Sequence, residues 1–202
     1  MITDRMNPSM TNLKVNIIAN YSAKVVNVIL SLAFVPIFLS YLGVSAWGLV
    51  GFYTSLLAIF SLLDFGLGVA VNREFAKQSI SGKKITNQAN FLRTLEAFYW
   101  MAAILISILF LTLSETITTY WIQDNSIPKS DLTLVVILMG FNIAIYLPFG
   151  LYSGGMLGLQ KQLQLNLITI FYSFSRTFGS VVILHYVSNS LISFFIWQLL
   201  AL

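Results

Sequence analysis

The sequence predicts an all-α integral membrane protein, built as a bundle of about six transmembrane helices. Hydrophobic residues make up 57% of the 202 positions and charged residues 9%, whereas soluble domains are about half apolar and about a quarter charged. The mean hydropathy is +0.83. The few charges are grouped between long apolar runs and are not spread along helix faces, so the chain cannot build a water-soluble surface.

Long apolar runs define the predicted helices, because about 20 apolar residues are needed to cross the hydrocarbon core of a bilayer. The predicted spans cover residues 16–41, 46–71, 91–114, 131–157, 165–187 and 190–202. The last run has about 12 residues, too few to cross unless more chain follows, so we expect a truncation within the sixth span. The loops are too short to hold a soluble domain, and residues 1–202 are predicted to form a single transmembrane domain.

The basic residues alternate between the two sides of the predicted membrane. They precede the first span and lie around the loops after the second and fourth spans: Arg5, Lys14, Arg73, Lys77, Lys83, Lys84, Arg93 and Lys161. The opposite loops contain Lys129 alone, with three acidic residues around it. The positive-inside rule therefore predicts a cytoplasmic N-terminus. The basic residues form no continuous face, which argues against a nucleic-acid partner.

The composition also limits the chemistry that the chain can perform. There is no cysteine and one histidine, His185, so thiolate nucleophiles, disulfides and zinc–thiolate sites are excluded. A lone histidine has no second histidine with which to form a metal pair. We expect no catalytic residue, no metal and no cofactor, and we do not expect an enzyme.

Polar side chains form stripes along the predicted helices, at spacings of three and four residues that place them on one face. Span one carries Asn16, Asn20, Lys24, Asn27 and Ser31; span two carries Thr54, Ser61, Asp64, Gly68 and Asn72; span five carries Asn166, Thr169, Ser173, Arg176 and Ser180. Hydrogen bonds between membrane helices, worth about 0.6 kcal/mol each, would explain isolated serines and threonines. They explain stripes that contain charged residues less well.

Among the charged residues, Lys24, Asp64 and Arg176 lie deepest inside the predicted spans. Each costs about 2.5–3.5 kcal/mol at a helix centre, so each must be paired, snorkelling or facing water. Lys24 and Asp64 lie at similar depth and could form an ion pair. Arg176 lies near the midplane and is predicted to line an aqueous or substrate cavity. The candidate substrate path consists of Arg176, Lys24, Asn20, Asn27, Ser173 and Asp64.

Small residues and prolines predict how the fourth span packs and bends. Gly150, Gly154 and Gly158 recur at intervals of four, a pattern that lets membrane helices approach closely. Pro36 and Pro148 each remove a backbone hydrogen bond within a span and permit a kink.

Several segments resemble a known family. They are Val35-Pro36-Ile37-Phe38, Tyr41-Leu42-Gly43, Trp47-Gly48-Leu49, Leu63-Asp64-Phe65-Gly66-Leu67-Gly68 with Asn72-Arg73-Glu74, Gly158-Leu159-Gln160 with Asn166, and Phe195-Ile196-Trp197-Gln198. Together they cover nearly the whole chain. The chain resembles the O-antigen and polysaccharide flippases of the MATE-like multidrug, oligosaccharidyl-lipid and polysaccharide exporter superfamily. The residues that match the family's cytoplasmic-end motif are Asp64, Gly66, Gly68 and Arg73.

The resemblance implies a fold of two helical lobes around a central cavity, of which this chain is the N-terminal lobe. It implies a substrate, an undecaprenyl-pyrophosphate-linked oligosaccharide moved from the cytoplasmic to the periplasmic leaflet. It also implies a multi-pass protein of the bacterial cytoplasmic (inner) membrane, with membrane lipid and other polysaccharide-assembly membrane proteins as partners. Relatives have a second lobe of similar size, which this sequence lacks.

Two other functions remain open. A small-molecule or drug exporter of the same fold fits almost as well, although a cavity for cationic drugs should be acidic. A membrane-embedded polysaccharide polymerase or transferase would usually need clustered acid–base residues or a large extracytoplasmic loop, and the sequence has neither.

Overall fold

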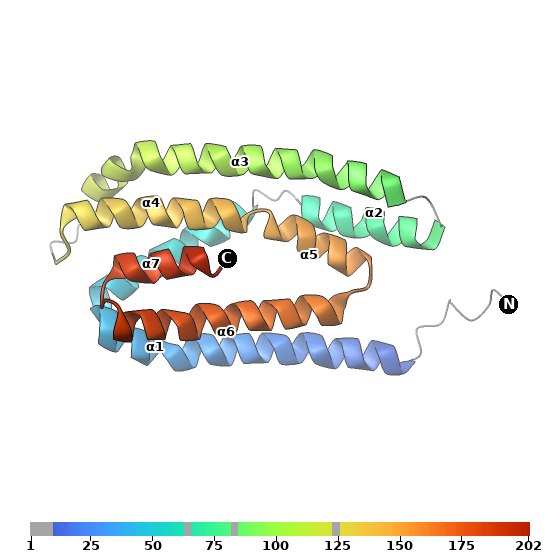
Figure 1. Cartoon of the computed structure of the whole chain (residues 1–202), viewed down its shortest axis with the longest axis horizontal. Coiled ribbons are helices and arrows are strands. Elements are labelled where there is room, and N and C mark those ends of the chain that lie inside the picture. The colour runs from blue at the N-terminus through green and yellow to red at the C-terminus, as the bar shows by residue number, and fades with distance from the viewer. Residues whose placement is uncertain (1–9, 63–65, 82–84, 123–125) are drawn as a thin grey trace.

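The computed structural model describes residues 10–62, 66–81, 85–122 and 126–202, with the side chains of residues 10–20, 23, 78–81 and 85–88 outside the description. The described residues form helices and no strand (Figure 1). The helices are α1 (Met10–Ser61), α2 (Leu67–Ser81), α3 (Ile85–Tyr120), α4 (Lys129–Tyr146), α5 (Phe149–Gly158), α6 (Gln162–Tyr186) and α7 (Leu191–Leu200).

Four helical segments are long and apolar enough to cross a membrane. They are Lys24–Ser61, Ala89–Tyr120, Lys129–Gly158 and Gln162–Tyr186, and α7 is a shorter apolar helix. Large apolar side chains such as Leu32 and Phe171 are exposed on the outside of the bundle, as contact with lipid tails requires. The predicted all-α membrane fold is confirmed.

Helix α1 contains the first predicted span and the greater part of the second, and it doubles back at Gly43. The backbone of Gly43 has φ +81° and ψ 168°, in a region that glycine adopts without steric cost. The ring of Phe38, before the turn, stacks on that of Trp47, after it, with a centroid distance of 5.2 Å. The turn falls between the predicted spans 16–41 and 46–71.

The second crossing is interrupted, which differs from the single uninterrupted span predicted over residues 46–71. Helix α1 ends at Ser61, α2 begins at Leu67, and Gly66 has φ +74°. A left-handed residue ends a right-handed helix, so the two helices cannot merge here. Figure 1 shows α2 extending onward from the second half of α1, which carries this crossing as far as Ser81.

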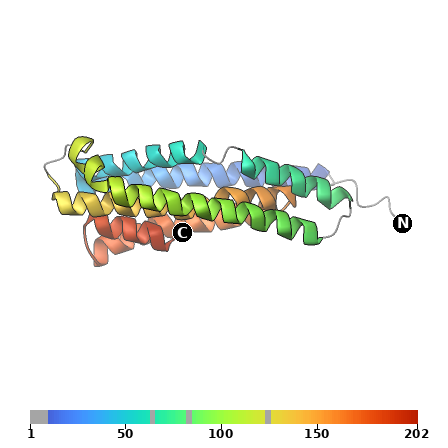
Figure 2. The ribbon, with the colours of Figure 1, turned by 90° about the horizontal axis from the view of Figure 1, so that it is seen from above.

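The crossings lie side by side with their turns at two ends of the bundle (Figures 1 and 2). The start of α1, the end of α2, the start of α3 and the α5–α6 connection lie at one end. The bend between the two halves of α1, the end of α3, the start of α4 and the α6–α7 connection lie at the other. The helix ends that flank the basic loops, which the sequence predicts to be cytoplasmic, therefore share one end.

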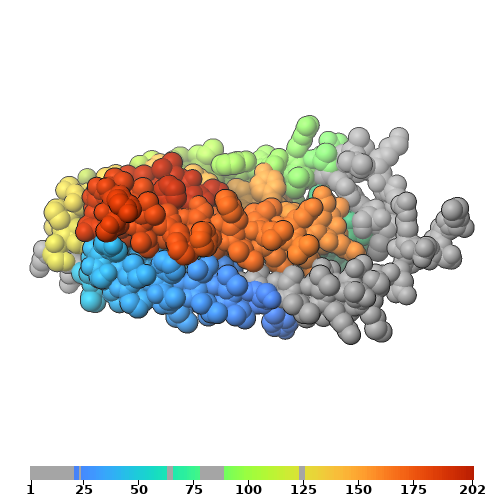
Figure 3. Space-filling view, turned by 60° about the horizontal axis from the view of Figure 1, so that its bottom comes forward, coloured from blue at the N-terminus to red at the C-terminus, as the bar shows by residue number. Residues whose placement is uncertain are grey.

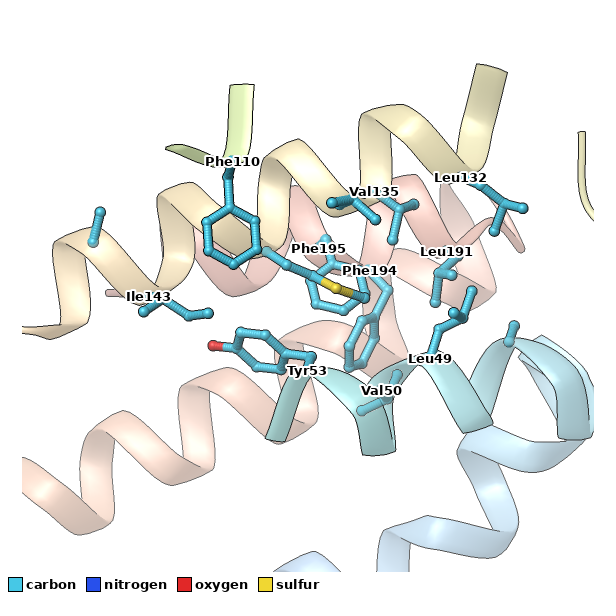
Figure 4. Close-up of a cluster of buried hydrophobic side chains, with 14 of the residues drawn as sticks. Leu49, Val50, Tyr53, Phe110, Leu132, Val135, Ile143, Leu191, Phe194 and Phe195 are labelled. Atoms are coloured by element: carbon cyan, nitrogen blue, oxygen red, sulfur yellow. The ribbon is translucent and has the colours of Figure 1, made fainter. Parts of the chain in front are cut away.

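The largest core lies where the second half of α1 meets α3, α4 and α7. Its fully buried members include Val136, Met139 and Phe195. Figure 4 shows the ring of Tyr53 among these side chains, and the Tyr53 and Phe195 rings meet edge to face with centroids 5.3 Å apart. The core thus holds Tyr53 and α7 in a defined position relative to each other.

A second, smaller core joins α2 and α5 along glycines. A Cβ at Gly154 would lie 2.2 Å from the Gly68 oxygen, and a Cβ at Gly158 would lie 2.5 Å from the Asn72 oxygen. From the first contact to the second, the chain advances by four residues on α5 and by four residues on α2. The two helices therefore run parallel where they lie closest. The predicted small-residue seam is confirmed at Gly154 and Gly158.

The two prolines behave differently. Pro36 lies within the continuous first half of α1. Pro148 lies at the junction of α4, which ends at Tyr146, and α5, which begins at Phe149. A proline lacks the N–H needed for the helical hydrogen bond and clashes with the preceding turn, so the predicted kink is found at Pro148.

Candidate functional site

A cavity of about 510 Å³ lies between the two halves of α1, α6 and α7. Figure 3 shows α6 and α7 beside the first half of α1 on one face of the molecule. The polar side chains that line the cavity are Asn27, Ser31, Tyr53, Thr54, Tyr172, Ser173, Arg176, Thr177 and Gln198. The predicted polar stripes of spans one, two and five therefore meet at one cavity inside a largely apolar bundle.

Arg176 is the charged residue of this cavity. It lies in α6, which runs from Gln162 to Tyr186, so at 1.5 Å per residue it is roughly 21 Å from one helix end and roughly 15 Å from the other. An arginine this far from both ends cannot easily snorkel to an interface. The prediction that Arg176 lines a cavity near the midplane agrees with its position.

Three neutral side chains hold the guanidinium. Its Nε donates to Oε1 of Gln198, Nη1 donates to the Tyr172 hydroxyl at 3.2 Å, and Nη2 donates to the Tyr53 hydroxyl at 3.4 Å. The carbon Cζ also lies 5.8 Å from the ring centroids of both tyrosines, within the range of cation–π attraction. The group is fixed in position without any neutralising carboxylate among these partners.

Gln198 is the anchor of this arrangement. Its side chain is 4% exposed, and its Nε2 donates to Oγ of Ser180 at 2.9 Å. The Ser180 hydroxyl in turn donates to the backbone carbonyl of Arg176 at 2.6 Å. The hydrogen bonds form a closed circuit between α6 and α7, which orients the amide so that its oxygen faces the guanidinium.

The site is electrostatically unbalanced. Within the described part of the chain, no carboxylate lines the cavity and Arg176 is its one ionised group. The guanidinium has five N–H donors, of which three bond to described side chains. Asn27 contributes an unused acceptor, because its Oδ1 is buried without a hydrogen-bond partner among the described residues. The cavity can therefore accept an anion that also carries hydroxyl donors.

An aromatic stack borders the cavity on the α4–α5 side. The rings of Tyr172 and Tyr146 lie at a centroid distance of 6.5 Å and 28° apart. Tyr146 continues the stack onto Phe149, with centroids 5.4 Å apart. Tyr172 thus presents its hydroxyl to Arg176 while its ring is supported from behind.

The predicted substrate-path residues are only partly brought together. Arg176, Ser173 and Asn27 line the cavity. Lys24 is exposed on α1, one turn from Asn27, and is not among the described residues lining the cavity. The side chain of Asn20 and all of Asp64 lie outside the described residues, and with Asp64 the predicted Lys24–Asp64 ion pair does too.

The family-motif residues have structural positions at the start of α2. Gly66 adopts φ +74°, Gly68 is buried against Gly154, and Arg73 is exposed on α2. None of these three lines the Arg176 cavity. Asp64 lies outside the described residues.

Sequence reasoning did not identify Gln198 or Tyr53 as partners of Arg176. They lie 22 and 123 residues from Arg176 along the chain, and no helical spacing relates such distant positions. One signal was present, because Gln198 is the one amide side chain in the apolar run of α7, and polar groups within membrane helices usually face the bundle interior.

Other polar groups of the bundle serve its packing. Asn142 on α4 is fully buried, and its Nδ2 donates to the carbonyl oxygens of Leu138 and Phe195. Among the described residues, no group of three His, Cys, Asp or Glu side chains could hold a metal ion.

The comparisons with known proteins give no relative. No family model, no curated protein and no solved structure matches the chain.

Proposed function

We propose that this chain is one lobe of a flippase that moves a lipid-linked oligosaccharide, joined through a pyrophosphate, between the leaflets of a membrane. The observation that carries the proposal is the charge of Arg176, held by neutral partners in a polar cavity among apolar helices. A positive group in a medium of low dielectric attracts an anion strongly. Leaving it without an anion is costly.

A pyrophosphate fits this arrangement because a guanidinium presents parallel N–H donors that match phosphate oxygens in a bidentate contact. Sugar hydroxyls would find partners in the rest of the lining. The Asn27 oxygen is a buried acceptor without a described partner, and Ser31, Thr54 and Ser173 contribute hydroxyls.

The resemblance supplies the remaining detail of the proposal. The substrate would be an undecaprenyl-pyrophosphate-linked repeat unit of O-antigen or a related polysaccharide, moved from the cytoplasmic to the periplasmic leaflet of a bacterial inner membrane. The N-terminus would be cytoplasmic, since the basic loops share its end of the bundle. A second lobe would face this one across the Arg176 cavity.

The two other functions have less support at this cavity. An exporter of cationic drugs would need an acidic cavity, whereas the described lining contains an arginine and no carboxylate. A polymerase or transferase would need acid–base groups within reach of one another, and the described lining offers tyrosines, amides and hydroxyls around Arg176.

The test is transport of a fluorescent polyprenyl-pyrophosphate oligosaccharide by the full-length, two-lobed protein in proteoliposomes, read as protection of the label from a membrane-impermeant quencher. Hydrogen bonds to charged groups are worth about 1.5–3 kcal/mol, so Arg176→Gln should slow transport by roughly 10- to 100-fold at unchanged protein content. Arg176→Lys should recover part of the rate, because an ammonium keeps the charge but lacks the planar fork.

The matched control is Arg93→Gln, which removes an arginine that is exposed on α3 and lies outside the described lining of the cavity. It should transport at the wild-type rate. Wild-type transport by Arg176→Gln, or equal loss in both variants, would refute the role of Arg176 in substrate transport.

A further inference from the structure

The second crossing leaves one side open on each of its two helical segments. A set of exposed residues recurs at intervals of three or four along the second half of α1 and along α2, which follows the 3.6-residue turn of a helix. They are Gly51, Ser55, Ala58, Leu62, Gly66, Val69, Arg73 and Lys77. Figure 2 shows the two segments end to end along one edge of the bundle. We call these residues the open strip.

The first part of the open strip borders the Arg176 cavity. Gly51 and its neighbour Thr54 belong to the lining of that cavity, and Ser55 continues the strip with another small side chain. The exposed face of α3 instead carries large apolar side chains, such as Ile104 at 59% exposed, as contact with lipid tails requires. Small side chains leave room beside the backbone, so the open strip is continuous with the cavity in which we place a pyrophosphate.

Two cations end the open strip on α2. Arg73 and Lys77 are four residues apart, so their side chains are neighbours on one helix face, and both are exposed. Neither has a hydrogen bond or an ion pair with any side chain that the structure describes. Glu74 lies on the next face, where it is half-buried and has an interaction of its own. Two positive charges therefore stand together without an internal partner.

The depth of this basic pair suits the phosphate of a lipid. The segment Lys129–Gly158 has 30 residues and is roughly 45 Å long as a helix, close to the thickness of about 40–45 Å of a bilayer with its headgroups. A Cβ at Gly158 would lie 2.5 Å from the Asn72 oxygen, so Arg73, the next residue, is level with the end of that segment and with the headgroups. Val69 lies one turn earlier on α2, roughly 6 Å nearer the hydrocarbon core.

We propose that Arg73 and Lys77 bind the pyrophosphate of a prenyl-pyrophosphate lipid before it reaches the Arg176 cavity. A guanidinium and an ammonium side by side can each bind one of the two phosphate groups. Val69 and Leu62 are exposed on the core side of the pair, where they can contact the prenyl chain. The identity of this ligand rests on the proposed function, but the site itself is separate, because neither cation is among the described residues that line the Arg176 cavity.

The experiment measures binding of radiolabelled geranylgeranyl pyrophosphate to the full-length protein in nanodiscs of zwitterionic lipid, with empty nanodiscs as background. The parent protein carries Arg176→Gln, so that the Arg176 cavity does not contribute to binding, and it should bind the probe saturably. Adding Arg73→Gln or Lys77→Gln should weaken binding at least about tenfold, because each substitution removes a charged hydrogen-bond donor. The same two substitutions in the otherwise wild-type protein should remove the part of the binding that does not depend on Arg176.

Two matched controls separate the site from the general charge of this end of the bundle. Arg93→Gln on α3 and Lys161→Gln, between α5 and α6, each remove an exposed cation. The positive-inside rule treats these cations and the basic pair alike, whereas the proposed site requires both controls to bind the probe as the parent does. Geranylgeraniol, which lacks the pyrophosphate, should bind all variants alike.

Three outcomes would overturn the site. They are the absence of saturable binding by the Arg176→Gln parent, an equal loss in Arg93→Gln, and displacement of the probe by phosphatidylglycerol as effective as displacement by unlabelled probe. The last outcome would identify the pair as a surface for any anionic lipid. Wild-type transport by Arg176→Gln bears on the proposed function alone, so the two proposals fail by different measurements.

Discussion

Replacing Gly154 with alanine tests how far the close approach of α2 and α5 stabilises the bundle. The new Cβ would lie 2.2 Å from the carbonyl oxygen of Gly68 and 2.8 Å from its carbonyl carbon. Carbon–oxygen contacts between packed helices are about 3.3–3.6 Å long, and backbone atoms cannot rotate away as a side chain can. The two helices must therefore separate by about 1 Å.

The cost follows from the contacts that surround the seam. Leu151, Val71 and Phe75 form a small buried core between these helices, and a radial gap of about 0.5–1 Å forfeits about a quarter to a half of each dispersion contact. Inserting a methyl group into a packed core costs about 1–3 kcal/mol. We expect Gly154→Ala to lower the free energy of unfolding by that amount.

The assay is unfolding of the purified protein in mixed micelles by increasing SDS fraction, followed by far-UV circular dichroism. The control is Gly51→Ala, since a Cβ at Gly51 has no atom within 4 Å; it should be neutral or gain up to about 1 kcal/mol from helix propensity. Gly155→Ala should fall between the two, because its nearest neighbour is the Phe75 ring at 3.4 Å. Equal unfolding midpoints for Gly154→Ala and Gly51→Ala would refute the seam.

Three further predictions concern topology and buried polar groups. Single cysteines placed at Ser81 and Ser126, in a chain that has none, should label from opposite sides of the membrane; labelling from one side would overturn the arrangement of the crossings. Gln198→Leu removes the acceptor of the guanidinium and should destabilise the protein by about 1–3 kcal/mol, so an unchanged unfolding midpoint would contradict its anchoring role. If Lys24 and Asp64 form an ion pair, exchanging their charges should restore the expression lost in either single reversal, and additive defects would exclude the pair.

The helical crossings could be predicted from the sequence because bilayer thickness sets a length that apolar runs must match. The predicted span 91–114 is shorter than helix α3, which extends from Ile85 to Tyr120. Hydropathy detects the apolar part alone, whereas the helix continues through polar residues beyond the hydrocarbon core. The interruption near Gly66 was not predicted. Glycine is common within membrane helices, so a glycine in an apolar run does not by itself indicate a left-handed φ.

The candidate site could be predicted one helix at a time. Helical spacing placed Arg176 and Ser173 on one face, and Asn27 on another, and the structure brings these faces together at one cavity. The partners Tyr53 and Gln198 could not be predicted, because they depend on how distant helices pack.

The two interruptions, near Gly66 and at Pro148, lie at nearly the same level of the bundle, since Gly68 packs on Gly154 and both α2 and α5 leave in the same direction. Helices α2 and α5 share their own core, apart from the larger core of α4 and α7. An open pocket of about 240 Å³ lies at the junction, bordered by Ser61 and Gly150. The bundle thus has two tiers, each with its own core, that meet where α1 gives way to α2 and α4 gives way to α5, while α3 and α6 run through both tiers without a break.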